Sequence, residues 1–230
     1  MQPQWQTATH GQGYSGDVAE SRNKVLRNTY LMLALTMIPT ALGAWAGTAM
    51  QFAMRGWTGL IVFLVVSFGM FYAISKTKHS PLGVVLLLAY TGFMGLWLSQ
   101  ILQVALKFSN GAQLIGLAAA GTGTIFFTLA TLATVIKKDL SFMSKFLFVG
   151  VILLMLTAVA NIFLQLPALS LAISAIAVLI FSAYILYDVS QIVNGGETNY
   201  VWATLQLYLD IYNVFTSLLH LLMSLGGERD

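Results

Sequence analysis

Two aspartates, Asp188 and Asp210, are the only acidic side chains in the seven long apolar stretches of the sequence. Asp188 lies near the end of the sixth stretch, and Asp210 lies inside the seventh. A carboxylate placed in hydrocarbon costs at least ~2.5 kcal/mol, so an intramembrane aspartate is a candidate functional residue when a partner can be named. Each of these two aspartates can be the partner of the other.

The chemistry of such a pair depends on a shared proton. Two carboxylates in a low-dielectric interior cannot both be ionised cheaply, so we expect Asp188 and Asp210 to share a proton and to titrate as a pair. The protonated pair forms a hydrogen-bonded latch, whereas the ionised pair repels itself and attracts cations or water. The pattern therefore predicts a pH switch. The alternative is that both aspartates are neutral and only hold two helices together.

A polar stripe runs along the seventh apolar stretch on either side of Asp210. Its residues recur at intervals of four and three, which places them on one helical face. A polar face in lipid turns inward, so we predict that the seventh helix is central and is wrapped by the other six. The stripe and its shorter counterpart on the sixth stretch consist of Gln206, Asp210, Asn213, Ser217, His220 and Ser224, and of Tyr184, Asp188 and Gln191.

The connection between the two stretches contains Gly195 and Gly196, which can adopt the backbone conformations that a chain reversal needs. At 1.5 Å per residue, Asp188 lies ~9 Å before the turn and Asp210 lies ~15 Å after it. The two depths differ by about one helical turn. The spacing is compatible with contact between the carboxyl groups but does not force it.

The composition requires a membrane protein. Of the 230 residues 58% are hydrophobic and 8% are charged, whereas soluble domains contain about 25% charged residues. The absence of cysteine excludes disulfides and thiolate metal sites. Because a span needs ~20 apolar residues, we predict an all-α integral membrane protein with seven transmembrane helices, at about 29–50, 57–75, 82–105, 113–135, 145–165, 168–192 and 201–224.

The chain divides into three parts. Residues 1–28 are polar and are predicted to form a disordered cytoplasmic tail, residues 29–226 form the membrane domain, and residues 227–230 form a short C-terminal tail. Most basic residues fall on the N-terminal side of the membrane, which places the N-terminus in the cytoplasm. We therefore interpret the net charge of +3 as a signal for membrane orientation and not as a sign of nucleic-acid binding. The side of the C-terminus stays open, because the connection 194–199 has no basic residue.

Small residues recur in the first and third stretches. Gly43 and Gly47 are four apart in the first, and Gly92, Gly95 and Ser99 follow one another in the third. Helices in lipid associate through such small residues, so we interpret them as packing positions. The alternative is a water path lined by threonine and glutamine side chains.

Several long runs resemble one protein family. They are Ala160-Asn-Ile-Phe-Leu-Gln-Leu-Pro-Ala-Leu169, Gly195-Gly-Glu-Thr-Asn-Tyr200 and Leu207-Tyr-Leu-Asp210-Ile-Tyr-Asn-Val-Phe215. In these runs the chain resembles the Bax inhibitor-1 family, in its bacterial YccA branch. The resemblance covers nearly all of the sequence beyond residue 22.

The resemblance implies a seven-helix fold with the seventh helix wrapped by six, in the bacterial inner membrane. It implies a protein that associates with the membrane-bound AAA protease FtsH and modulates it. Other members of the family are pH-sensitive calcium leak channels with a di-aspartyl sensor, whose positions match Asp188 and Asp210. Channel-like members also pair this site with an arginine of the second helix, and residues 57–75 contain no basic residue.

Three functions therefore compete. For a protease modulator, the predicted tail 1–28 would offer an AAA protease an end to grip, with the lipid bilayer and FtsH as partners. For a cation leak, Asp188, Asp210, Gln191, Gln206 and Asn213 supply fewer good ligands than the six to eight oxygens that calcium prefers. We therefore expect at most a weak calcium transit site, no firm metal site and no cofactor.

The third candidate is an intramembrane aspartyl protease. Tyr187-Asp188 is similar to the first aspartate motif of that class, but Leu207-Tyr-Leu-Asp210 stands where the second motif needs Gly-x-Gly-Asp. Ser217 and His220 lack an orienting residue and an oxyanion element. His220 lies ~15 Å from Asp210 along the helix axis, so it is expected to be a seam-packing or interfacial residue and no part of the sensor. We predict that the protein is not an enzyme and has neither a nucleic-acid partner nor a soluble small-molecule substrate.

Overall fold

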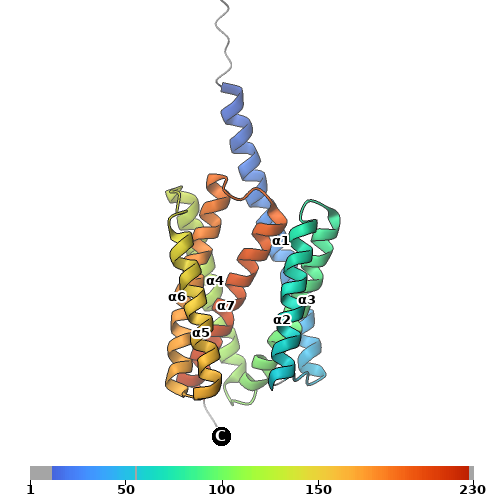
Figure 1. Cartoon of the computed structure of the whole chain (residues 1–230), viewed down its shortest axis with the longest axis vertical. Coiled ribbons are helices and arrows are strands. Elements are labelled where there is room, and N and C mark those ends of the chain that lie inside the picture. The colour runs from blue at the N-terminus through green and yellow to red at the C-terminus, as the bar shows by residue number, and fades with distance from the viewer. Residues whose placement is uncertain (1–11, 55, 228–230) are drawn as a thin grey trace, which may run out of the picture.

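The computed structural model describes residues 12–54 and 56–227, and within them the chain forms seven helices and no strands (Figure 1). All seven helices are long and apolar enough to cross a membrane, which confirms the predicted fold class. The ends of the last six agree with the prediction to within two residues. The helices are α1 (Gln12–Ala49), α2 (Gly56–Thr77), α3 (Pro81–Ala105), α4 (Gly111–Ile136), α5 (Met143–Leu164), α6 (Pro167–Asn194) and α7 (Tyr200–Gly226).

Helix α1 begins well before the predicted position. Residues 12–28 continue the first span as helix, so the prediction of a disordered tail is wrong for them, while residues 1–11 lie outside the described part of the chain. For residues 22–28 the physical reason is tertiary contact: Val25 and Leu26 pack against the main apolar core, and Arg22 lies against Gly195. At 1.5 Å per residue, α1 is roughly 57 Å long, about twice the thickness of the hydrocarbon layer.

The connections contain local signals that start and stop helices. Pro81 and Pro167 open α3 and α6, where the missing N–H has no helical partner to lose. Asn199 caps α7 by accepting a hydrogen bond from the backbone N–H of Trp202 at 2.9 Å. Gly195 ends α6 with φ of +81°, in the left-handed region that favours glycine.

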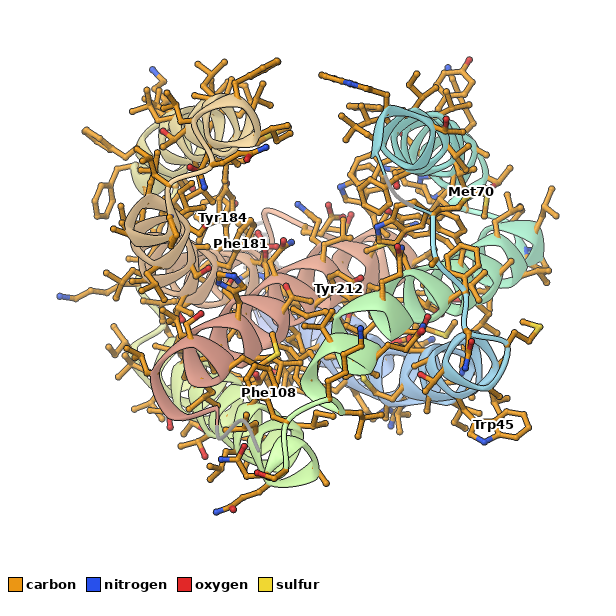
Figure 2. The ribbon with its side chains drawn as sticks, turned by 90° about the horizontal axis from the view of Figure 1, so that it is seen from below. Trp45, Met70, Phe108, Phe181, Tyr184 and Tyr212 are labelled. Carbon is orange, nitrogen blue, oxygen red and sulfur yellow. The ribbon has the colours of Figure 1, made fainter. Side chains whose placement is uncertain are left out.

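The packing around α7 is less symmetric than predicted. Helix α7 packs against α1, α3, α4 and α6, whereas α2 packs mainly on α3 and α5 packs mainly on α6. Figure 2 accordingly shows Met70 of α2 and Tyr184 of α6 on opposite sides of the bundle. The prediction that six helices wrap α7 is not confirmed. Leu147 is the only buried residue of α5. The remaining side chains of this apolar helix are thus suited to face lipid.

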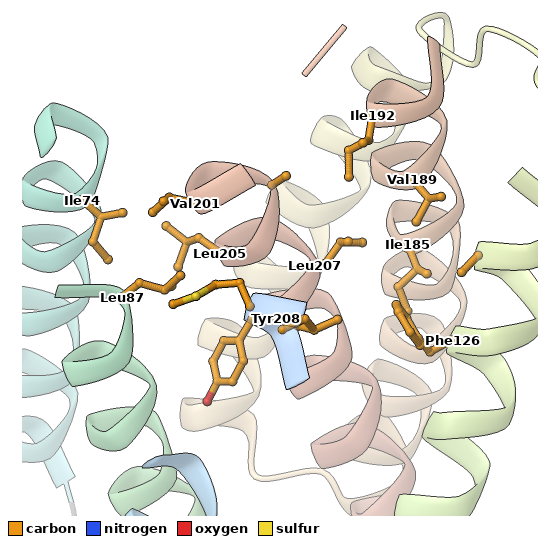
Figure 3. Packing of buried hydrophobic residues seen from close by; sticks show 14 of the residues in the cluster. Ile74, Leu87, Phe126, Ile185, Val189, Ile192, Val201, Leu205, Leu207 and Tyr208 are labelled. Atoms are coloured by element: carbon orange, nitrogen blue, oxygen red, sulfur yellow. The ribbon is translucent and has the colours of Figure 1, made fainter. Parts of the chain in front are cut away.

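The apolar core follows α7 on both of its sides (Figure 3). Leu205 lies toward Leu87 of α3, and Leu207 lies toward Ile185 of α6. All four side chains are fully buried. Helix α7 is therefore fixed between two groups of helices, and its position sets the height at which Asp210 lies.

Helices α1 and α3 approach each other closely through their glycines. A Cβ atom on Gly43 would lie 2.2 Å from the carbonyl oxygen of Gly92, and one on Gly95 would lie 2.1 Å from that of Thr40. No side chain can be added at such distances without moving a backbone. The interpretation of these small residues as packing positions is confirmed.

Candidate functional site

The α6–α7 turn positions the two aspartates. The backbone N–H groups of Gly196 and Glu197 both donate to the carbonyl oxygen of Gln191, at 2.8 and 3.1 Å, and so close the last turn of α6. A Cβ atom on Gly196 would lie 2.3 Å from the side-chain oxygen of Gln191. The first glycine is therefore needed for its φ angle, whereas a side chain at the second would displace the end of the Gln191 side chain.

The side chains of Asp188 and Asp210 meet between α6 and α7. Both residues are buried, with 5% and 6% of their surface exposed. Their carboxyl groups lie within reach of each other, and a hydrogen bond between them requires a proton on one of the two. The second oxygen, Oδ2, of Asp210 is buried without a hydrogen-bond partner. The contact that the sequence left open is therefore present.

Buried apolar side chains flank Asp188 along α6. Ile185 and Val189 are fully buried neighbours of Asp188 (Figure 3). Such surroundings disfavour a free charge and strengthen any polar contact that is made. The tyrosine ring of Tyr184 lies within electrostatic range of both aspartates. The arrangement can hold a shared proton in a site with little solvent.

A small polar cavity of about 110 Å³ opens beside Asp188. It is large enough to hold water. Asp188 is among its lining residues, and Asp210 is not. The two aspartates thus differ: one faces a space that water can enter, and the other is enclosed. The cavity is lined by Tyr187, Asp188, Gln191, Ile192, Gly196, Glu197, Ala203 and Gln206.

The α4–α5 connection covers the outer end of this region. The side-chain amide of Gln191 donates to the hydroxyl of Ser141 at 3.1 Å, and that hydroxyl donates to Asp139. The backbone N–H of Ser141 also donates to Asp139, at 2.8 Å. These hydrogen bonds from Ser141 lower the pKa of the exposed Asp139 carboxyl below its ordinary value. An ionised group is therefore linked through two side chains to the mouth of the cavity.

The predicted polar stripe divides into two parts. Gln191 and Gln206 line the cavity with Asp188. Asn213 lies deeper and donates to the carbonyl oxygen of Leu209 in its own helix.

The deeper end of the stripe serves packing. Ser217 lies beyond Asn213 and outside the cavity. The Nδ1 atom of His220 is 2.9 Å from the hydroxyl of Ser174 on α6, which agrees with the packing role predicted for His220. The stripe is therefore a site only at its outer end.

Sequence reasoning missed polar contacts on the opposite face of α7. The hydroxyls of Tyr208 and Thr40 are 2.9 Å apart, and the hydroxyl of Tyr212 donates to the carbonyl oxygen of Met94 at 3.3 Å. The spacing of four between the two tyrosines was the available signal. Glu197, Asp139 and Ser141 were also missed, because loop residues show no helical period.

Within residues 12–54 and 56–227, no three His, Cys, Asp or Glu side chains are grouped as metal ligands. Lys76, the basic residue of α2, lies over the ring of Tyr72, with 5.6 Å from Nζ to the ring centre. In the described residues the aspartate pair is thus a two-carboxylate site without a basic partner on α2.

The chain is similar to known proteins over nearly its whole length. The family model described as "Inhibitor of apoptosis-promoting Bax1" matches residues 22–227, which include α2 to α7 and most of α1. The protein belongs to the Bax inhibitor-1 family. The matched range contains both aspartates and the two glycines of the α6–α7 turn.

Several bacterial relatives of this family member match over most of their length. The modulator of FtsH protease YccA of Escherichia coli (strain K12) is 43% identical over 202 residues, which cover 88% of this chain and 90% of that protein. An uncharacterised protein of Pseudomonas aeruginosa is 41% identical over 213 residues, 92% of this chain and 95% of the relative. An uncharacterised protein of Neisseria meningitidis serogroup A is 39% identical over 213 residues, which cover 90% of this chain and 94% of that protein. The family member is therefore a multi-pass membrane protein similar to a protease modulator.

Proposed function

We propose that this protein modulates an FtsH-type AAA protease in a bacterial inner membrane, with its N-terminus in the cytoplasm. The observation that carries the proposal is the 43% identity to the modulator of FtsH protease YccA over 88% of the chain. The corresponding protein of another Escherichia coli strain is named inner membrane protein YccA. The excess of basic residues at the N-terminal end of the bundle supports the orientation.

The N-terminal part of α1 is the element best placed to contact a protease. Figure 1 shows it projecting beyond the ends of the other helices. In the proposed orientation this projection lies in the cytoplasm, where ATP is available to an AAA protease. Residues 1–11, ahead of it, lie outside the described part of the chain.

The test is a pull-down from native membranes with the full chain and with residues 1–22 deleted. We expect the full chain to retain the FtsH protease and the truncated chain to lose it, because the projecting segment is removed. Turnover of the membrane substrates of the protease is measured in parallel. No association of the full chain, together with unchanged turnover in a deletion strain, would refute the proposal.

A second candidate function is a pH-sensitive leak of calcium or another cation. The observation that favours it is the shared site of Asp188 and Asp210, with Asp188 open to a cavity. In this reading calcium is a permeant ion in weak transit, because two carboxylates and a few amides supply an incomplete shell. Protonation of the pair closes the path, and ionisation opens it.

Flux into liposomes tests this second candidate. Calcium uptake by the reconstituted protein is expected to change with pH and to lose that dependence in Asp210→Asn. The exposed Glu20 provides a matched control, because Glu20→Gln removes the same charge outside the pair. Flux that is indifferent to Asp210→Asn would exclude the mechanism. Protease association unchanged in Asp210→Asn would show that the two functions are separate.

A further inference from the structure

A large apolar groove lies between α1 and α4 and shares no lining residue with the cavity of Asp188. Its volume is about 540 Å³, within the range of ~300–1,000 Å³ that is typical of ligand sites. Helices α1 and α4 pack little against each other, and α7 and α3 form the floor between them. Its lining includes Leu33, Gly123, Phe126, Tyr212 and Phe215.

The groove offers hydrocarbon and almost nothing polar. The hydroxyl of Thr122 donates to the carbonyl oxygen of Ala118 at 2.7 Å. The hydroxyl of Thr40 donates to the carbonyl oxygen of Thr36 at 2.8 Å, and Tyr208 and Tyr212 are engaged by the contacts described above. Every hydroxyl of these four residues thus has a partner within the protein. A ligand of this part of the groove gains from apolar contact, as an alkyl chain does.

One end of the groove is bordered by a bridge between Tyr30 of α1 and Thr134 of α4. The hydroxyl of Tyr30 faces that of Thr134. The hydroxyl of Thr134 donates to the carbonyl oxygen of Ala130 at 2.7 Å, so it is available to Tyr30 only as an acceptor. The ring of Tyr30 also packs edge-on against Phe126, with 6.0 Å between ring centres. Tyr30 and Phe126 therefore mark the end of the groove at which the headgroup of a bound lipid would lie.

Basic side chains follow directly beyond the bridge on both helices. Arg27 is one turn beyond Tyr30 on α1, and Lys137 is one turn beyond Thr134 on α4. Both are exposed. Of the nearest acidic residues described, Glu20 is about two turns further out on α1, and Asp139 is bonded to Ser141. The end of the groove thus has the charge that suits an anion.

We propose that the groove binds an anionic phospholipid, with one acyl chain between α1 and α4 and the phosphate beside Arg27 and Lys137. The occupant follows from the surroundings, because lipid is the solvent of this face. Basic pockets between helices on the cytoplasmic side of membranes bind anionic headgroups. The bound chain completes the packing between α1 and α4, which the protein itself leaves incomplete.

Two glycines of α4 allow a matched test of the acyl-chain site. Gly123 lines the groove and Gly116 does not, and a Cβ atom on either meets no other atom within 4 Å. The full chain is reconstituted in vesicles of equal phosphatidylglycerol and phosphatidylcholine, extracted, and analysed by native mass spectrometry. We expect the wild type and Gly116→Leu to retain one phosphatidylglycerol, and Gly123→Leu to lose most of it.

The headgroup is tested with substitutions that leave the groove unfilled. Arg27→Gln and Lys137→Asn should each lower the preference for phosphatidylglycerol over phosphatidylcholine by about fivefold. Asparagine suits position 137 because Lys137 has φ of +51°. The exposed Lys145 on α5 gives the control, since Lys145→Gln removes a charge at the same end of the bundle but away from the groove.

Three outcomes would overturn the proposal. The first is equal phospholipid retention in Gly123→Leu and Gly116→Leu. The second is equal retention of phosphatidylcholine and phosphatidylglycerol by the wild type. The third is a second copy of the chain in the groove, seen as a dimer mass that disappears in Gly123→Leu.

Discussion

Two pairs of helices, α1 with α3 and α6 with α7, are held together by different kinds of contact. At the α1–α3 seam, glycines bring the two backbones together, and a methyl group on Gly95 would lie 2.1 Å from a carbonyl oxygen. At the α6–α7 seam, two acidic side chains meet in an apolar surrounding, and an oxygen of Asp210 has no partner. The first seam depends on shape, and the second depends on a proton.

This difference identifies which part of the bundle can respond to its surroundings. A close-packed contact has one arrangement, because any displacement costs dispersion energy over many atoms. A carboxyl pair has two arrangements of similar geometry, protonated and ionised, with different mutual forces. The α1–α3 seam therefore serves as the fixed frame, and we propose the α6–α7 seam as the place where a change of pH acts.

The largest effect on stability is expected from a large side chain placed in the contact between α1 and α3. Gly95→Leu should destabilise the protein by ~3 kcal/mol or more, because the added atoms meet the backbone of Thr40. The free energy of unfolding in mixed detergent micelles measures it. Gly69→Leu on α2 is the control, since a Cβ atom there meets nothing within 4 Å. Equal stability of both variants would mean that the close approach of α1 and α3 contributes nothing.

A smaller effect is expected from removing one member of the acidic pair. Asp210→Leu leaves Asp188 buried without its partner, at a cost of about 1–3 kcal/mol. Asp210→Asn keeps a polar group that can donate to Asp188 and should cost less. The same unfolding measurement separates the two variants. A leucine variant as stable as the wild type would show that the pair contributes function alone and no stability.

The hydroxyl of Tyr208 connects α7 to the frame, and its removal should have a modest effect. Tyr208→Phe breaks the contact of 2.9 Å with Thr40 while keeping the ring. Hydrogen bonds between membrane helices contribute ~0.6 kcal/mol on average, and a similar loss of unfolding free energy is expected. Thr40→Val should give the same loss, and the double variant no more than either, if the two hydroxyls act together.

The smallest effect concerns the exposed loop over the cavity. Hydrogen bonds from Ser141 lower the pKa of Asp139, so their stabilisation is present above the ordinary pKa of the carboxyl. It is lost as the pH falls through the lowered value. Ser141→Ala should raise the pKa of Asp139 toward 3.8. Carbon-detected NMR titration of the side chain measures it, and an unchanged pKa would contradict the assignment.

The sequence predicted the elements well because membrane spans obey simple rules. Length and apolarity located α2 to α7 to within two residues, and the small residues of α1 and α3 indicated their packing. The start of α1 was wrong because Val25, Leu26 and Arg22 are held by tertiary contacts. Composition alone cannot show such contacts in a polar segment.

The site was predicted in part for a similar reason. Helical periodicity placed Asp188, Asp210, Gln191 and Gln206 on facing stripes, and the structure brings them together. It also extended the stripe to Ser217, because periodicity does not show where a stripe stops facing the cavity. The contribution of Ser141 was missed, since contacts of a loop depend on how distant helices are arranged.

The order of synthesis has a consequence for the burial of Asp188 beside Asp210. Helix α6 leaves the ribosome before α7, so Asp188 enters the membrane while its partner is still absent. For that interval the apolar remainder of α6 has to outweigh a cost of at least ~2.5 kcal/mol. The glycines of the α1–α3 frame belong to the first half of the chain and are synthesised before either aspartate. Assembly of this protein thus finishes, not begins, with its most polar contact.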